Sequence, residues 1–230
     1  MAKQGRTQHQ GTYQRGEDSR QQLISAGLTI FGKYGFEGAS TRMLAETANV
    51  NLAAIPYYFG GKEGLYRAVV EHVAEQIRER QAPVAARIAS RFHSDLSQEE
   101  SLSLLHELLD SFATTIIGSD EAEQWARIIM REQMDPTPAF DILYSGVIKQ
   151  IHGICALLIG RMLEQAEDDP NTLIRAFTIM GQILIFRAAN AATLKRLGWK
   201  KFSADRVSQI QAIVRQQVDA ILQQPQKDAP

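Results

Sequence analysis

Apolar residues recur three and four positions apart along almost the whole chain from Ser19 onward, and alternation of apolar and polar positions never lasts beyond a few residues. This spacing gathers apolar side chains on one face of an α-helix. We therefore predict an all-α protein. Residues 1–17 are rich in Gln, Gly, Thr and Arg and lack the helical period, so we predict that they form a disordered arm.

The N-terminal third carries helix-ending signals at short intervals. Glycine and asparagine adopt the left-handed conformation that ends helices, and serine and asparagine side chains cap helix starts. Such residues are Gly35, Ser40, Asn49, Asn51 and the pair Gly60–Gly61. The helices that they delimit run over residues 19–34, 41–48 and 52–59, followed by a long helix from Lys62 to about Ala82, where Pro83 interrupts.

Helical stripes continue through the rest of the chain. Residues 102–116 carry one stripe of apolar positions and residues 125–129 another. An aspartate followed by proline is a strong helix start, and this pair occurs at residues 135–136 and 169–170. The helices predicted in this part run over residues 136–162, 171–191 and 205–222.

Two short helices joined by a tight turn are typical of the helix-turn-helix, whose second helix enters the major groove of DNA. Ala45 and Ala48 let the two helices cross closely, and Ala53 and Ala54 let the second one approach base edges. Side chains near its end suit phosphate oxygens: Tyr57, Tyr58 and Lys62. The alternatives are core positions for the tyrosines and an ordinary solvated charge for the lysine.

Three runs closely resemble the DNA-binding domain of the TetR family of transcription regulators: residues 31–36, 40–45 and 51–66. This resemblance covers about residues 19–67. A weaker one, to the C-terminal domain of the CecR-like subgroup, lies in residues 131–140, 181–187 and 197–199. The family implies a symmetric homodimer that binds a palindromic DNA operator and releases it when a small molecule enters the helical C-terminal domain.

The resemblance also assigns DNA contacts. The residues concerned are Thr41 and Arg42 on the supporting helix, Asn51, Ala53 and Ala54 toward the groove, and Tyr57, Tyr58 and Lys62 on the phosphate backbone. Two positions depart from the family pattern. Asn49 replaces the usual glycine of the turn, and Pro56 stands where relatives usually have a residue that can touch phosphate. Proline lacks an N–H, so we predict that the helix tightens or kinks there.

Composition and charge fit a regulator of this kind. The chain has 230 residues, 44% of them hydrophobic, and a net charge of −1. Residues 1–67 hold 8 Lys and Arg against 5 Asp and Glu, so a mildly basic DNA-reading domain precedes an acidic remainder. No apolar run approaches the roughly 18 residues of a membrane span. The polar N-terminus predicts no signal peptide, and a single cysteine, Cys155, fits a reducing cytoplasm.

No sequence pattern points to catalysis, a metal or a cofactor. His152 and Cys155 lie three positions apart on one predicted helix, but two ligands fall short of a metal site. Core packing is the better interpretation for Cys155. His152 could line a pocket or be a buried, satisfied histidine. We therefore predict no catalytic residue, no metal and no cofactor.

The C-terminal domain is the predicted site of a small-molecule effector. Its candidate pocket residues are aromatic or polar: Arg131, Gln133, Phe140, Tyr144, His152, Phe177, Gln182 and Phe186. Core packing or helix pairing is the alternative for each one. Arg131 and Arg187 need an anionic partner on an apolar helix, which Glu132 or Glu164 could supply. Three glycines inside long helices indicate either close packing or room for a ligand: Gly153, Gly160 and Gly181.

The predicted organisation is an arm over residues 1–17, a three-helix helix-turn-helix domain over 18–66 and a helical effector-binding and dimerisation domain over 67–230. The helices at about 171–191 and 205–222 carry apolar residues on two faces, so we predict that they form the dimer contact. We expect a cytoplasmic DNA-binding regulator that represses transcription. Two alternatives remain, a helical interaction module for a protein or lipid and an enzyme acting on a small molecule.

Overall fold

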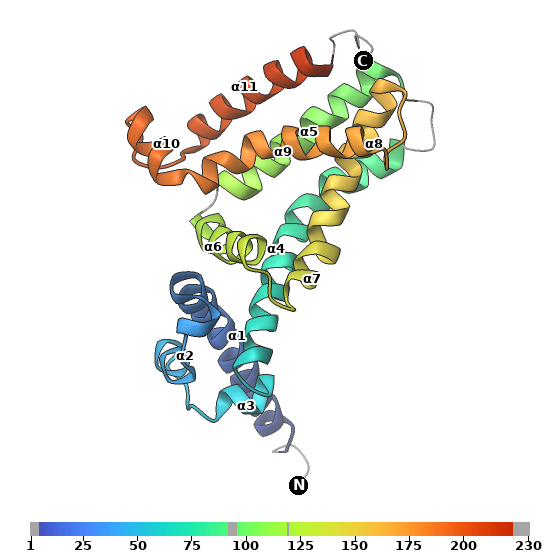
Figure 1. Ribbon diagram of the computed structural model, residues 1–230. Helices are drawn as coiled ribbons and strands as arrows, with labels where there is room; N and C mark the ends of the chain where they lie inside the picture. Colours follow the sequence, from blue (N-terminus) through green and yellow to red (C-terminus); the bar gives the residue numbers. More distant parts are fainter. Residues whose placement is uncertain (1–4, 92–95, 119, 223–230) are drawn as a thin grey trace. The chain divides into compact units, whose positions relative to one another are not determined.

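The computed structural model describes residues 5–91, 96–118 and 120–222, and within these ranges it contains helices and no β-strand (Figure 1). The all-α prediction is confirmed. The elements are α1 (Gly5–Gly38), α2 (Thr41–Ala48), α3 (Ala54–Phe59), α4 (Lys62–Arg91), α5 (Gln98–Ile117), α6 (Asp120–Met134), α7 (Phe140–Leu143), the π-helical turn η1 (Tyr144–Ile148), α8 (Lys149–Leu163), α9 (Pro170–Ala188), α10 (Asn190–Leu197) and α11 (Ala204–Leu222).

The chain divides into two compact units. We call the first unit the head, which consists of residues 1–74 and 127–143, and the second the body, which consists of residues 75–126 and 144–230. Both α4 and α6 run from one unit into the other. The segment 127–143, which the sequence analysis assigned to the C-terminal domain, therefore packs with the helix-turn-helix.

A small apolar core fixes the helices of the head. Leu23 and Phe31 of α1, Leu44 of α2, Ile55 of α3 and Leu65 of α4 are fully buried. Burying one such side chain contributes about 1.5–3 kcal/mol. This core holds α2 and α3 against α1, so each short helix has one inner face and one outer face.

Two helices in the first 91 residues are longer than predicted. α1 begins at Gly5, so most of the segment predicted to be a disordered arm is helical. α4 continues through Pro83 to Arg91. Proline removes one helical hydrogen bond. The turns after Pro83 nevertheless bury the apolar side chain of Ile88, and this burial stabilises the continued helix.

The helix predicted to start at residue 136 begins at Phe140 instead. Before this start, the amide and hydroxyl of Thr137 donate to the carboxylate of Glu132. The helix then passes through η1, and such π-helical turns are frequent at functional sites. The second aspartate–proline start is confirmed, since the Asp169 side chain caps α9.

In the body, α5, α8 and α9 pack against one another, and α11 packs on all three (Figure 1). Leu105, Leu158 and Ile179 are fully buried in this core. The predicted core position of Cys155 is confirmed, and burial raises the pKa of its thiol to about 12. The body thus has a continuous core of its own.

One helical stretch, residues 140–163, is long and apolar enough to cross a membrane, with a mean hydropathy of 1.6. The sequence analysis did not single it out. A core helix meets the same criterion, and this stretch buries Ile151, Cys155 and Ile159 against its neighbours. In all, 39% of its most apolar window is buried, so packing takes up part of its apolar surface.

Candidate nucleic-acid interface

The turn between α2 and α3 is built as the sequence predicts. The Ser40 hydroxyl accepts a hydrogen bond from the Met43 amide at 3.2 Å, and α2 has the predicted bounds. Asn49 adopts the left-handed conformation with φ 54° and ψ 44°. The Val50 amide then donates to the Ala45 carbonyl at 3.0 Å. The chain reverses within a few residues, as a helix-turn-helix requires.

α3 begins at Ala54, two residues later than predicted, because a capping turn precedes it. The Asn51 side chain accepts a hydrogen bond from the Ala53 amide, and the Ala54 amide donates to the Asn51 carbonyl, both at 2.9 Å. This tight turn lies before Pro56, whereas the sequence analysis placed a tightening or kink at Pro56 itself. Pro56 consequently lies in the first turn, where an N–H has no partner inside the helix, so it breaks no helical hydrogen bond.

The outer face of α3 is open to solvent. Ile55 anchors the helix to the core, whereas Asn51, Ala53 and Pro56 are exposed and Ala54 is half-buried. Tyr57 is 80% exposed, which excludes the alternative that it is a core aromatic. Its ring packs edge-on against the half-buried ring of Tyr58, with centroids 4.8 Å apart. The two phenols form a polar ridge beside small side chains.

A glycine brings the end of α3 against the start of α4. Gly60 takes a left-handed conformation (φ 74°) and ends α3, as predicted. A Cβ atom on Gly64 would lie 1.7 Å from the carbonyl oxygen of Phe59, so no larger residue fits unless the backbone moves. The sequence analysis missed Gly64. The available signal was a glycine within the first turn of a long helix.

The two cations predicted to bind phosphate already have partners in the head. Arg42 donates to Glu46 at 2.9 Å on the exposed face of α2. An exposed pair at this spacing is worth about 0.3–0.5 kcal/mol, so exchanging the carboxylate for a phosphate costs little. Lys62 donates to the Ala39 carbonyl at 3.1 Å, and its ammonium lies 4.3 Å above the Phe36 ring. Lys62 therefore also holds the loop before α2.

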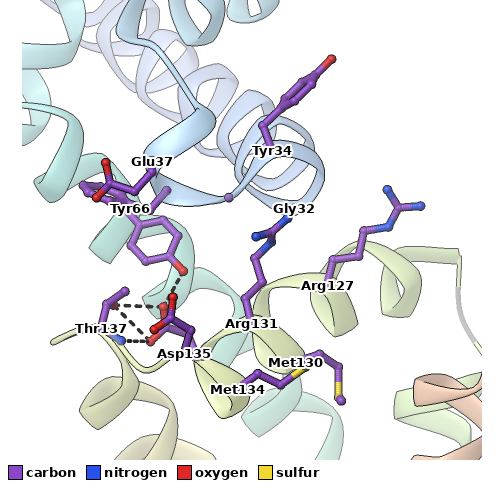
Figure 2. Close-up of a pocket in the computed structure, with 13 residues that line it drawn as sticks. Gly32, Tyr34, Glu37, Tyr66, Arg127, Met130, Arg131, Met134, Asp135 and Thr137 are labelled. Atoms are coloured by element: carbon purple, nitrogen blue, oxygen red, sulfur yellow. Dashed lines mark hydrogen bonds between the residues drawn. The ribbon is translucent and has the colours of Figure 1, made fainter.

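A buried carboxylate ties the segment 127–143 to α4 inside the head (Figure 2). Glu132 has no exposed surface, and its oxygens accept hydrogen bonds from the Tyr66 hydroxyl at 2.5 Å and from the Thr137 amide and hydroxyl at 3.1 and 3.0 Å. Burial, and then this hydrogen bond, raise the pKa of the Tyr66 phenol. The phenol stays protonated, so it keeps donating to the carboxylate.

Arg131 binds a backbone carbonyl of α1 just before Gly35, where the helix is kinked. Its guanidinium donates to the Lys33 carbonyl at 3.4 Å and would lie 2.6 Å from a Cβ atom on Gly35, whose φ is 76°. Beside it lies a pocket of about 600 Å³ in the head, lined partly by Tyr34 and Met130. Figure 2 shows this pocket. The prediction that Arg131 pairs with a carboxylate is therefore wrong, because a backbone carbonyl near a helix end accepts its hydrogen bond instead.

The structure places the other candidate effector residues at several different positions. The rings of His152 and Phe177 stack with centroids 4.2 Å apart, and burial lowers the pKa of His152. The exposed members of the set are Gln133, Tyr144 and Phe177, and the half-buried ones are Phe140, His152, Gln182 and Phe186. Within this set, a ring contact brings His152 and Phe177 together.

Arg187 also takes backbone partners. It donates to the carbonyls of Ile116 and Ile117, at 3.0 Å each, where α5 ends. Free carbonyls at a helix C-terminus carry partial negative charge, which explains why an arginine can be half-buried there without a carboxylate. Across the described ranges, no three His, Cys, Asp or Glu side chains lie close enough to hold a metal ion.

A small cavity of about 60 Å³ lies in the body between α4, α5 and the start of α8, beside η1. Gln81 is buried at its edge and donates to the Thr115 hydroxyl at 2.8 Å. The side-chain oxygen of Gln81 has no hydrogen-bond partner in the described part of the chain. Ile151 and Ile154 also line the cavity, so apolar walls occur together with the unpartnered acceptor of Gln81.

Two families match the sequence. Residues 23–69 match the family described as bacterial regulatory proteins, tetR family. Residues 102–224 match the C-terminal domain of the HTH-type transcriptional dual regulator CecR. The CecR protein of Shigella flexneri is 32% identical over 209 residues, which cover 91% of this chain and 93% of that protein.

Solved structures share the fold. A protein from Mesorhizobium loti assigned to the TetR family superposes with a TM-score of 0.57 at 16% identity, covering 90% of this chain and 96% of that one. HlyIIR, a hemolysin II transcriptional regulator, superposes with a TM-score of 0.55 at 19% identity, covering 86% and 97%. These similarities extend over head and body alike.

Proposed function

The chain belongs to the TetR family of bacterial regulators and is a DNA-binding transcriptional regulator, and we propose that it is a homodimeric repressor of a palindromic operator. A small-molecule effector would release it. The observation that carries the proposal is the exposed outer face of α3 on a firmly capped helix-turn-helix. The Shigella relative is named a dual regulator, so activation at some operators is compatible with the same binding mode.

We propose that the outer face of α3 enters the major groove. Small side chains at its start, Ala53 and Ala54, leave room for base edges, and Asn51 offers an amide there. The phenol groups of Tyr57 and Tyr58 lie farther along, where phosphates border the groove. Thr41, Arg42 and Lys62 would complete the phosphate contacts from α2 and α4.

We propose the cavity beside Gln81 as the starting point of the effector site. The free acceptor on Gln81 and the apolar walls favour a small, largely apolar molecule with one hydrogen-bond donor. At about 60 Å³ the cavity must widen to admit such a molecule, and the adjacent η1 is the irregular segment that could adjust. Of the candidate effector residues, Tyr144 lies in η1.

Effector binding would reach the head through the helices that run between the units. Gln81 lies on α4, which begins at the DNA-reading end of the head. A ligand that binds one shape of the body better than another shifts the protein toward that shape, by as much as the two affinities differ. A coupling of about 1–3 kcal/mol would weaken operator binding by roughly 5–150-fold.

Selection of genomic fragments on the purified protein tests the proposal. We expect enrichment of an inverted repeat whose half-site centres lie about 10–10.5 base pairs, or a multiple of this, apart. Tyr57→Ala should abolish enrichment, whereas Tyr144→Ala, a control on the body, should retain it. Recovery of fragments without a shared repeat would contradict operator recognition.

The same experiment addresses location and catalysis. The relatives described above are all named as regulators of transcription. Their names support a cytoplasmic location for this protein and the absence of a catalytic role. An effector identified by operator release should be recovered unchanged after incubation with the protein. Conversion of the effector to a product would instead support the enzyme alternative.

A further inference from the structure

The head contains a pocket that the proposed function does not use. Its volume of about 600 Å³ is within the roughly 300–1,000 Å³ typical of small-molecule sites. The end of α1, Tyr66 of α4 and residues from the segment 127–137 line it (Figure 2). All three belong to the head, whereas the cavity beside Gln81 lies in the body. The pocket is therefore a second and separate candidate site.

Apolar side chains line this pocket outside the core of the head. Tyr34 is 43% exposed and Met134 is 81% exposed, and Met130 is half-buried. On the side of α1, Gly32 and Gly35 contribute only backbone. A ligand that covered these apolar side chains would remove them from water, which is favourable. Methionine side chains also adapt to the shape of what they contact. The pocket therefore suits a ligand with an apolar part.

One wall of the pocket is basic. Arg127 and Arg131 line it from successive turns of α6, so their backbones are about 6 Å apart along the helix axis. Of the five N–H groups of the Arg131 guanidinium, one donates to the Lys33 carbonyl at 3.4 Å, and the others have no partner in the part of the chain that the structure describes. Figure 2 shows both arginines on the same side of α6. A guanidinium can hold a carboxylate through two parallel hydrogen bonds, so this wall suits a carboxylate.

Two carboxylates line the same pocket from the end of α1 and from the loop after α6. Glu37 and Asp135 are exposed, and neither forms an ion pair within the described ranges. In Figure 2 they lie on the Tyr66 side of the pocket, away from Arg127. A third carboxylate, that of Glu132, is buried and already accepts the hydrogen bonds described above. Opposite charges therefore line one pocket without neutralising one another.

We propose that this pocket binds a small zwitterion, a molecule with a carboxylate at one end, an amine at the other and an apolar part between them. The carboxylate binds Arg127 and Arg131. The protonated amine lies beside Glu37 and Asp135, and the apolar part covers the methionine side chains. A sphere of about 600 Å³ is roughly 10 Å across, close to the length of extended ω-aminooctanoate. A molecule with only one of the two charged groups leaves the other end of the pocket without a counter-charge and binds more weakly.

Such a zwitterion would connect two parts of the head. Glu37 lies at the end of α1, and Arg127 lies on α6. Hydrogen bonds of Glu132 and Arg131 already tie this part of α6 to α4 and α1, and the zwitterion would add to them. A ligand that binds only this folded arrangement stabilises it. The effector of the proposed function would then have a further contact to overcome, but binding in the pocket does not depend on that function and can be measured without DNA.

Three probes with the same carbon chain test the chemical class of the ligand. ω-Aminooctanoate carries both charges, octanoate lacks the amine and octylamine lacks the carboxylate. In isothermal titration calorimetry of the full chain, ω-aminooctanoate should bind at one site per chain. Each of the other two should bind at least tenfold more weakly, because each loses one charge-assisted contact. ω-Aminohexanoate and ω-aminoundecanoate bracket the length of the pocket. Octanoate binding as tightly as ω-aminooctanoate, or no binding by any of these probes at millimolar concentration, would overturn the inference.

Substitutions at the two ends of the pocket test the orientation of the bound probe. Arg127→Gln should weaken ω-aminooctanoate binding about tenfold and leave octylamine binding unchanged, whereas Glu37→Gln should weaken ω-aminooctanoate binding and leave octanoate binding unchanged. Arg67→Gln and Glu71→Gln are the matched controls, because both residues are exposed on α4 in the head and do not line the pocket. Without a probe, all four variants should melt close to the wild type, since the replaced side chains are exposed. Binding that Gln81→Leu abolishes and Arg127→Gln does not change would place the probe in the body and contradict the proposal.

Hydrogen exchange locates the bound probe without any substitution. Because ω-aminooctanoate would tie the end of α1 to residues 127–137, amide exchange should slow in these two segments when the probe is added. Slower exchange in the body alone would place the probe in the cavity beside Gln81 and overturn the inference. A chain that binds the probe in the head but selects no operator would refute the proposed function and leave this site standing.

Discussion

Replacing Tyr66 by phenylalanine should destabilise the head by about 1.5–3 kcal/mol. The substitution removes only the hydroxyl that donates to Glu132. The ring remains packed against Phe31 and Phe36, at centroid distances of 4.9 and 5.3 Å, so the apolar contribution is kept. Hydrogen bonds to charged groups are worth about 1.5–3 kcal/mol, and a buried carboxylate that loses a donor cannot recover it from water.

A double-mutant cycle in urea isolates this bond. We expect Tyr66→Phe and Glu132→Gln each to lower the free energy of unfolding and the double variant to lose less than the sum, with a coupling of at least 1 kcal/mol. Tyr57→Phe is the matched control, since its side chain is exposed, and it should stay within about 0.5 kcal/mol of the wild type. Additive single changes would show that Tyr66 and Glu132 do not interact energetically, and the reasoning would be refuted.

The same bond predicts a pH dependence. The folded protein raises the pKa of the Tyr66 phenol above its ordinary value of about 10. A raised pKa means that the folded state holds the proton more tightly, so the stabilisation is fully present below pH 10 and is lost as the pH rises above it. The stability difference between wild type and Tyr66→Phe should therefore be constant from pH 6 to 9 and shrink at higher pH.

Three further predictions test other parts of the structure. Gly64→Ala should destabilise the head by about 1–3 kcal/mol, because its Cβ meets the Phe59 carbonyl, whereas Gly153→Ala should raise the melting temperature slightly, as its Cβ meets nothing. Arg187→Met should lower the free energy of unfolding, measured in urea, by about 1–3 kcal/mol. Arg187→Lys should not restore the stability, because a lysine ammonium cannot reproduce the geometry with which the guanidinium donates to two carbonyls. Lys62→Ala should reduce the salt dependence of operator binding by about one unit; weaker binding with an unchanged slope would mean that Lys62 acts only by holding Ala39.

The helix-turn-helix could be predicted closely because its determinants are local. Ser40 and Asn49 cap helices through their own side chains and backbone, so their neighbours in sequence suffice to place α2. Pro83 shows the limit of local signals. Proline normally interrupts a helix, but the burial of Ile88 beyond it depends on tertiary packing that no local pattern reveals.

The buried carboxylate could not be predicted for a related reason. Glu132 and Tyr66 are far apart in the sequence, and each looks ordinary in its own helix. The sequence analysis paired Glu132 with an arginine because opposite charge was the only available criterion. In the structure the guanidinium of Arg131 takes the Lys33 carbonyl, and Glu132 takes neutral donors from Tyr66 and Thr137. Backbone carbonyls at helix ends accept hydrogen bonds, but the type of residue does not show which of these carbonyls will do so.

The size of the Tyr66–Glu132 bond bears on regulation. An effector that changes operator affinity by roughly 5–150-fold needs a coupling of about 1–3 kcal/mol, and one hydrogen bond to a buried carboxylate supplies about that much. Glu132 lies on α6 and Tyr66 on α4, the two helices that continue into the body. A ligand in the body that favours a different placement of either helix would therefore have to overcome this contact, together with the Arg131–Lys33 contact that also holds α6. Tyr66→Phe would then lower the free energy that separates the operator-binding state from the effector-bound state. We expect this variant to respond to less effector than the wild type does, and to bind operator more weakly when no effector is present.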